Sequence, residues 1–335
     1  MDVVLSWFVY GDMLRRAWDT SFLLIIILLL RKKAGERLRP SYRRILWGIC
    51  ALRIIFPLQL PIFHSFYEYV GVSQLYENVE RWISDISIQS FGKWHMAEIS
   101  NDTFVVWFKL RWLCFNFLDQ LFEKYTLQNI LVFLWFVGVI VIFTIFTARN
   151  IYFYRHIKKN SYLYGIRDNL PVYITDDKEG SCLFGIVNPE IYVGSKALNH
   201  ESWRSLIVSH ELMHYYAGDN LYRLFINICA IFMWFNPLVW YCVKISGHDC
   251  ELACDDRILM NMNRDLQVEY GQCLIAMAGH NRKHIAVASH LNNMILKKRI
   301  QHIADYNAPV KSDILFNNSV VVSVALLFAL CILSR

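Results

Sequence analysis

The chain has 335 residues, of which 56% are apolar and 19% charged, and its formal net charge is +6. With a mean hydropathy of +0.30, this composition is too apolar for an ordinary soluble protein and predicts membrane-spanning helices. The basic residues lie beside apolar runs, where they indicate membrane topology. No recognition helix is evident, so we predict no direct contact with nucleic acid.

Four apolar stretches are candidates to cross a bilayer of about 30 Å. They lie at about 3–30, 45–63, 130–147 and 314–333. The positive-inside rule places the basic loop 31–44 in the cytoplasm and the loop 65–128 outside. Within the outer loop, residues 104–115 are typical of an amphipathic helix on the membrane surface. Arg53, inside the second span, either couples helices or reaches the interface.

This topology divides the chain into three parts. Residues 1–148 form a three-span membrane region, residues 149–312 a cytoplasmic domain, and residues 313–335 the fourth transmembrane helix. The predicted fold class is therefore an α-helical membrane protein, with about four transmembrane helices and a cytoplasmic α+β domain. We expect a multi-pass protein of the cell membrane, in contact with lipid.

The cytoplasmic domain begins with short strands and ends with a polar segment. Residues 171–175 and 188–193 are typical of strands around a glycine-bearing loop. Residues 281–312 are basic and polar, and are interpreted as a connector. Six cysteines in apolar stretches are expected to be small buried residues. Cys250 and Cys254 are assigned to packing as well, although a second metal or redox site there stays open.

Residues 210–214 read His-Glu-x-x-His. On a helix, residues four apart share a face, so His210 and His214 can bind one ion. Glu211 then lies beside that ion and can take a proton from a water whose pKa zinc lowers to about 7. A solvated helix with two histidines is the alternative.

A third ligand is expected because catalytic zinc usually has three protein ligands and a water. Glu251 and Asp255 lie one helical turn apart, in the run Glu-Leu-Ala-Cys-Asp. We predict Glu251 as the third ligand. We predict that Asp255 hydrogen-bonds a ligating histidine and orients it. An acidic helix face in water is the alternative for both carboxylates.

The long apolar stretch at 221–246 separates these two groups of residues. A single membrane crossing would leave His214 and Glu251 on opposite sides, unable to share an ion. Asn236-Pro237 in its middle is a turn signal that ends a helix. We therefore predict two helices, at about 221–235 and 237–259, the second of which returns Glu251 to the histidines.

Taken together, the motifs resemble those of the integral-membrane zinc metalloproteases of the BlaR/MecR type, signal transducers of the β-lactam response. The matching pieces are Leu46-Trp47 with Arg53 and Pro57, Phe184-Gly185 with Pro189 and Ile191, Ser209–His214 with Asp219-Asn220, Phe235–Trp240, and Glu251–Asp255. The resemblance covers nearly the whole chain. It implies four spans and a gluzincin-like domain between the third and the fourth.

The resemblance also implies functional roles. His210, His214 and Glu251 would bind Zn²⁺, and Glu211 would be the general base and acid. The strand from Gly185 through Pro189 and Ile191 to Val193 would be the edge to which a substrate peptide adds as an extra strand. The substrate would be a winged-helix transcriptional repressor or the protease itself, with a self-cleavage site at about 285–300. Its cleavage would induce antibiotic-resistance genes.

One departure from the family pattern concerns sensing. Sensor members carry a penicillin-binding domain after the fourth span, whereas this chain ends at Arg335, so we expect either a truncated sequence or a member without a fused sensor. The outer loop, an extracellular ligand or a separate sensor protein would supply the signal, and a homodimer stays open. The alternatives are a membrane zinc protease for quality control or processing, and a non-catalytic receptor. Tyr215 and His248 are guesses for the oxyanion partner.

Overall fold

The structure is a computed structural model that describes residues 10–55, 127–175, 180–195, 197, 200–278 and 286–333. The predicted outer loop 65–128, with its amphipathic helix, lies outside the described residues except for its last two positions. The second half of the predicted second span and the side chain of Arg53 lie outside them as well. The chain divides into two compact units, 1–19 with 58–141 and 330–335, and 20–57 with 142–329.

Helices occur at all four predicted spans. They are α2 (Tyr10–Ala34), α3 (Pro40–Ile55), α8 (Leu127–Lys159) and α14 (Lys311–Leu333), with a short 3-10 helix, η1 (Gly35–Arg37), after α2. Among the described residues, one segment is long and apolar enough to cross a membrane, Phe133–Lys159 of α8. Phe143 and Ile145 of this segment are exposed, which suits contact with lipid. The four-span topology stays a prediction.

The second unit contains a four-stranded sheet with the order β1-β2-β4-β3. Its strands are β1 (Ser161–Arg167), β2 (Leu170–Thr175), β3 (Cys182–Phe184) and β4 (Glu190–Gly194). β4 pairs parallel with β2 and antiparallel with β3. The strands predicted at 171–175 and 188–193 are confirmed as β2 and β4, and the domain combines helices with a sheet as expected.

The predicted substrate edge is wrong in its position. Ile191 lies in β4, which is paired on both sides, and its side chain is fully buried. Pro189 and Gly185 belong to the turn that connects β3 to β4. Gly185 has a φ of +98°, and a Cβ there would collide with the carbonyl oxygen of Asn188, so this turn needs glycine. The free edge on this side of the sheet is β3.

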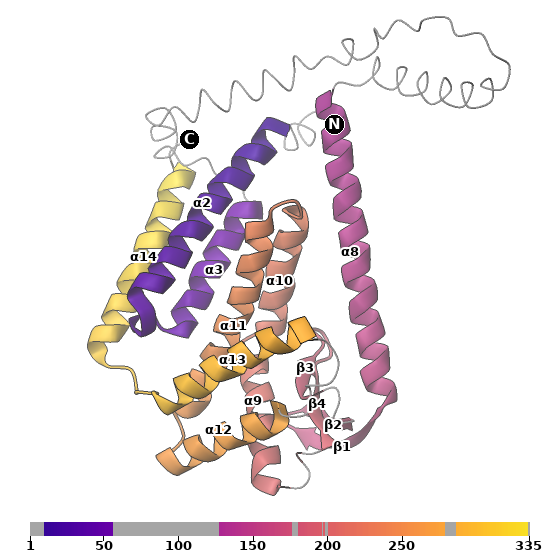
Figure 1. The fold of residues 1–335 in the computed structure, drawn as a ribbon, viewed down its shortest axis with the longest axis vertical. Coiled ribbons are helices and arrows are strands. Elements are labelled where there is room, and N and C mark those ends of the chain that lie inside the picture. Colours follow the sequence, from indigo (N-terminus) through magenta and orange to yellow (C-terminus); the bar gives the residue numbers. More distant parts are fainter. Residues whose placement is uncertain are drawn as a thin grey trace, which may run out of the picture. The chain divides into compact units, whose positions relative to one another are not determined.

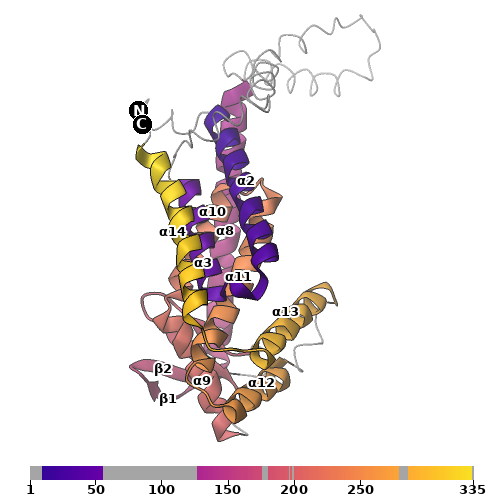
Figure 2. The ribbon, with the colours of Figure 1, turned by 90° about the vertical axis from the view of Figure 1, so that its left-hand side faces the viewer.

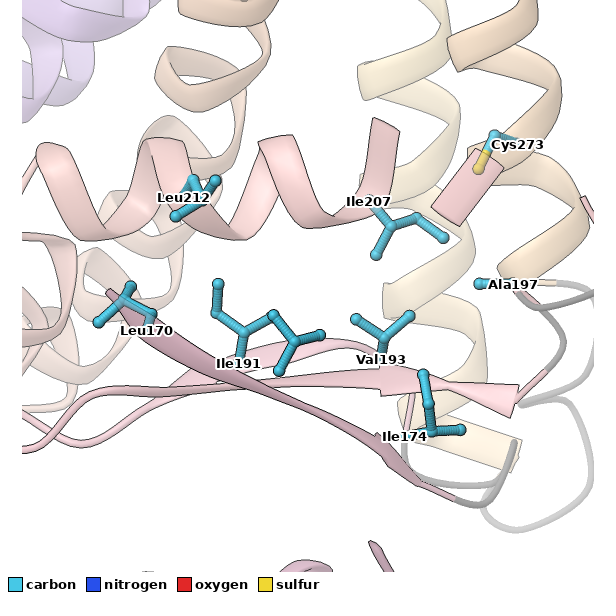
Figure 3. Close-up of a cluster of buried hydrophobic side chains, with 9 residues drawn as sticks. Leu170, Ile174, Ile191, Val193, Ala197, Ile207, Leu212 and Cys273 are labelled. Atoms are coloured by element: carbon cyan, nitrogen blue, oxygen red, sulfur yellow. The ribbon is translucent and has the colours of Figure 1, made fainter. Parts of the chain in front are cut away.

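Helix α9 (Glu201–Tyr216) lies across one face of the sheet. Leu170, Val172 and Ile174 alternate along β2 and point to the same face. Figure 3 shows Ile207 and Leu212 of α9 facing the sheet side chains. Each such aliphatic side chain contributes about 1.5–3 kcal/mol when fully buried, so this core fixes α9, with His210 and His214, on the sheet.

The chain folds back after α9 as predicted. Helix α10 (Asp219–Phe232) ends before Asn236, and α11 (Pro237–Leu259) begins after it. The Asn236 side chain accepts a hydrogen bond from the backbone N–H of Leu238, and Pro237 occupies the first helical position, where its missing N–H costs nothing. Helix α3 packs against both α10 and α11 (Figure 1).

Two further helices complete the second unit. They are α12 (Arg264–Ala278) and α13 (Ala286–Ala304). The interpretation of residues 281–312 as a connector is wrong over most of its length, because α13 is a helix that packs on α12 and α11. Figure 2 shows α12 and α13 on one side of α9, and β1 and β2 on the other. The buried side chain of Ile303 joins α13 to the core.

Candidate metal and peptidase site

His210 and His214 lie one turn apart on α9 and face the same side. Their Nε2 atoms are 3.2 Å apart. Glu251, from α11, places Oε2 3.5 Å from the Nε2 of His210 and Oε1 3.6 Å from the Nε2 of His214. The return of the chain at Asn236-Pro237 therefore brings the three predicted ligands to one point.

The spacing of these atoms suits a zinc ion. Zinc binds histidine nitrogens and carboxylate oxygens at about 2.0–2.2 Å, in tetrahedral geometry. Two ligand atoms of such a tetrahedron are about 3.3–3.4 Å apart. The separations of 3.2, 3.5 and 3.6 Å between His210, His214 and Glu251 agree with that value to within about 0.3 Å. Because histidine nitrogens and a carboxylate are also ligand types that zinc prefers, the donor set fits the ion.

The three residues line a cavity of about 350 Å³. Glu211 lines it too, although its side chain is otherwise buried. Cys182 and Leu183 of β3 and Leu296 of α13 line the same cavity. The predicted base and the predicted ligands thus share one cavity with the free edge of the sheet.

Asp219, the first residue of α10, contacts the His214 ring at Nδ1, the nitrogen that does not face Glu251. The Asp219 Oδ2 atom is 2.6 Å from the Nδ1 of His214. Burial lowers the pKa of His214, but this hydrogen bond and the nearby carboxylates of Glu251 and Glu211 together outweigh burial, and the pKa is raised. With Nδ1 engaged by a carboxylate, Nε2 is the nitrogen that is left to bind an ion. In the sequence, Asp219 is a matching motif position whose role only the fold makes visible.

His210 is held by Tyr270, which the sequence analysis missed. The Tyr270 hydroxyl is 2.9 Å from the Nδ1 of His210 and donates a hydrogen bond of 2.6 Å to Asp255. The Nδ1 of His210 lies 3.8 Å from Asp255, beyond hydrogen-bond length. The predicted direct bond from Asp255 to a histidine is therefore replaced by a contact through the phenol. No sequence spacing links α12 to this site.

Two arginines in the cavity were also missed. The Arg223 guanidinium lies 2.6 Å from Glu251 Oε1, and that of Arg299 lies 3.2 Å from Oε2. Arg299 is 13% exposed and makes two hydrogen bonds to Asp255, at 2.8 and 2.7 Å. Burial would raise the pKa of Glu251, but His210 and both arginines hold it well below its usual range. Glu251 is thus a carboxylate, the form that binds a metal.

Arg223 and Arg299 differ in how far the sequence could have revealed them. Arg223 lies four residues after Asp219 on the same face of α10, which is a usable signal. Arg299 lies in a basic stretch that has the composition of a solvated connector. Only the packing of its side chain distinguishes it from the lysines beside it.

Cys254 offers a competing ligand. His210, His214 and Cys254 have donor atoms within 4.8 Å of one another. However, the Cys254 sulfur lies 3.4 Å from the Nδ1 of His210, the nitrogen that faces away from Glu251, and it donates to the His210 carbonyl oxygen. Burial raises the pKa of the thiol, which keeps it protonated. We therefore favour Glu251 over Cys254 as the third ligand.

The guesses for the oxyanion partner do not match the cavity. Tyr215 is exposed, and neither Tyr215 nor His248 is among the residues that line the cavity. Besides the candidate ligands and base, the polar side chains that do line it are Ser181, Asn220, Arg223, Tyr270 and Arg299. The two arginines are the cations closest to Glu251 among the described residues.

The family described as BlaR1 peptidase M56 matches residues 13–303. The chain belongs to this family. The match includes every candidate site residue, and together with the histidine cluster it indicates a metallopeptidase.

Curated relatives resemble part of the chain. The methicillin resistance mecR1 protein of Staphylococcus aureus strain Mu50 is 23% identical over 153 residues, which are 44% of this chain and 26% of the relative. The regulatory protein BlaR1 of Bacillus licheniformis is 26% identical over 128 residues, 37% of this chain and 21% of the relative. BlaR1 of Staphylococcus aureus is 26% identical over 113 residues, 32% of this chain and 19% of the relative. The matched segments span about a quarter of these relatives or less.

Proposed function

We propose that this chain is a membrane-embedded, zinc-dependent endopeptidase that acts in signal transduction. His210, His214 and Glu251 hold the ion, and Glu211 is the general base and acid. The convergence of two Nε2 atoms and one carboxylate, at separations of 3.2 to 3.6 Å, carries the proposal. The presence of Glu211 beside them supports catalysis over a scaffold role, because a structural zinc site needs no base.

The chain's own residues supply binding and proton transfer. Zinc, when bound, polarises the peptide carbonyl and lowers the pKa of the attacking water. Glu211 takes the proton of that water and passes it to the leaving amine. Arg223 and Arg299 stabilise the negative charge that develops on the carbonyl oxygen. Tyr270 and Asp219 hold the two histidine rings in their orientations.

The substrate peptide adds to the edge strand β3. This strand pairs with β4 along one edge only, and its residues Cys182 and Leu183 line the cavity that contains the candidate ligands. An extended peptide on this edge would run beside the candidate ligands. The side-chain amide of Asn220 donates to the carbonyl oxygens of Leu183 and Gly185, and so ties β3 to the start of α10.

The relatives suggest the biological setting. They are named as a methicillin resistance protein and a regulatory protein. We propose that the zinc site faces the cytoplasm and that its substrate is this chain itself or a winged-helix repressor, whose loss induces resistance genes. The basic segment 31–44, which the structure shows as the end of α2, the short helix η1 and the start of α3, supports that orientation. A self-cleavage site at 285–300 would lie largely in α13, which must unfold before a protease can cut it.

The test is a cleavage assay in membranes. The wild-type chain, Glu211→Ala and His214→Ala are each expressed with a winged-helix repressor from the same genome, and both proteins are blotted for fragments. We expect fragments with wild type alone, zinc retained by Glu211→Ala, and zinc lost by His214→Ala. Cleavage by Glu211→Ala would refute the assignment of the base.

The same assay separates the alternatives. A quality-control protease would degrade an unfolded membrane protein supplied as a second substrate and leave the repressor intact. A non-catalytic receptor would give no fragments with any variant, including wild type treated with a β-lactam. Zinc measured in each purified sample shows whether a negative result reflects a lost site.

A further inference from the structure

Three arginines on either side of the loop between α2 and α3 contact the helices that carry the candidate site. Arg31, near the end of α2, donates from Nε and from a terminal nitrogen to Asp249 at 2.9 to 3.2 Å. Arg43 lies 3.6 Å from the same carboxylate, and the Trp47 indole donates to it at 2.9 Å. Asp249 is fully buried and lies two residues before Glu251, so α11 is anchored just before its candidate ligand.

The third arginine reaches the site itself. A terminal nitrogen of Arg44 lies 2.8 Å from the Oδ1 atom of Asp219 and donates a 2.8 Å hydrogen bond to the carbonyl oxygen of Ala217. The guanidinium also lies over the ring of Tyr222, 4.7 Å from its centroid. Arg44 is 17% exposed and Asp219 is 1% exposed, so water screens this ion pair little.

The two oxygens of Asp219 have different partners. Oδ1 pairs with Arg44, and Oδ2 lies 2.6 Å from the Nδ1 of His214. A buried charge is unfavourable unless it is paired, and Arg44 pairs with Asp219. The Oδ2 atom of Asp219 accepts the Nδ1–H of His214, which fixes the ring with Nε2 toward His210 and Glu251.

We propose that Arg44 is a positioning residue of the metal site and acts through Asp219 on His214. Helix α3, which precedes the peptidase domain in the sequence by about a hundred residues, is then part of that site. The inference rests on the proposed function and deepens it, since it concerns the ion that His214 is proposed to hold.

The test measures metal binding by the purified full chain in detergent. The affinity for zinc is determined by competition with a chelator, and the visible absorption of the cobalt(II)-loaded protein reports the ligand geometry. The variants are Arg44→Gln and Asp219→Asn. The matched control is Arg39→Gln, which removes a positive charge from the same segment, where Arg39 contacts Asn307 and Tyr306.

We expect Arg44→Gln and Asp219→Asn each to bind zinc about tenfold more weakly or worse, with an altered cobalt spectrum. Arg39→Gln should bind as the wild type does. Because Arg44 acts through Asp219, the double variant should bind no more weakly than Asp219→Asn alone. Wild-type affinity and spectrum in Arg44→Gln, or effects that multiply in the double variant, would overturn the inference.

Separate controls distinguish a folding failure of the variant from a failure of the proposed function. If Arg44→Gln does not fold, Arg44→Lys replaces it, because the lysine nitrogen lies one atom closer to its own Cα than the terminal nitrogen of arginine and cannot hold the same position against Asp219 and the Ala217 carbonyl oxygen. Its cobalt spectrum should move toward that of Asp219→Asn, and an unchanged spectrum would overturn the inference. Equal zinc affinity of wild type and His214→Ala would refute the proposed function instead, whatever Arg44 does.

Discussion

His210 and His214 are one turn apart on the same helix, yet opposite ends of the chain support them. Behind His214 is a carboxylate in direct contact, Asp219, which pairs with Arg44 of α3. Behind His210 is a phenol, Tyr270 of α12, which donates to a carboxylate farther away.

The support of His210 ends at Arg299 of α13, which pairs with Asp255. Each histidine is therefore connected to a guanidinium through a carboxylate. On the His210 side, one more side chain, that of Tyr270, lies between the histidine and the carboxylate. The difference shows that the candidate site connects α3 with the last helices of the domain, α12 and α13. A change at either end can reach the ion through one histidine.

The largest effect on stability is expected from removing the carboxylate of Asp255, on the His210 side. Asp255→Ala leaves the buried guanidinium of Arg299 without its main partner, and we expect it to lower the free energy of unfolding by about 3–5 kcal/mol. Denaturant unfolding of the metal-free chain in detergent measures this. Asp265→Ala, an exposed acidic position on α12, is the control and should change the free energy by about 0.5 kcal/mol or less. Equal losses in the two variants would contradict the pairing.

A smaller effect is expected from removing only the Tyr270 hydroxyl, which lies between His210 and Asp255. Tyr270→Phe keeps the ring but deletes the hydroxyl between His210 and Asp255, so we expect about tenfold weaker zinc binding and a loss of about 1–3 kcal/mol of stability. Chelator competition and unfolding are the measurements. Tyr241→Phe, at an exposed position, should leave both unchanged. Wild-type affinity in Tyr270→Phe would mean that His210 needs no support from α12.

The smallest effect is expected at Cys254, the competing ligand beside His210. If Glu251 is the third ligand, Cys254→Ala keeps zinc affinity within about twofold, whereas Glu251→Ala abolishes binding. The cobalt(II) spectrum of the wild type should lack the intense near-ultraviolet band of a thiolate ligand. Loss of zinc in Cys254→Ala, together with such a band, would assign the site to His210, His214 and Cys254.

The local elements were largely predictable from the sequence. The motif at 210–214, the turn at Asn236-Pro237 and the strands at 171–175 and 188–193 depend on periodicity, capping and backbone restrictions, which act between near neighbours. The requirement that His214 and Glu251 reach one ion even predicted the fold-back of the apolar stretch. A constraint on function thus corrected a reading that hydropathy alone would have favoured.

Strand order and long-range partners were not predictable in the same way. The sequence indicates that 188–193 is a strand, but it does not show that β3 pairs with this strand and forms the edge of the sheet. The substrate-binding edge was therefore assigned to the strand of Ile191, which is buried. The basic stretch around Arg299 resembled a connector because charge patterns do not show what a helix packs against. Only the packing of α13 on α12 and α11 brings that guanidinium to Asp255.

By itself, the sequence determined which residues could bind an ion, since the spacing of His210 and His214 and the helical turn between Glu251 and Asp255 are properties of a single helix. The tertiary structure alone decided what holds them. Arg44, Tyr270 and Arg299 are distant from the motif in the chain, and no local rule selects them from among the other arginines and tyrosines. They reach the site because burial of apolar faces brings α3, α12 and α13 around α9 and α11, and buried charges then require partners at hydrogen-bond distance.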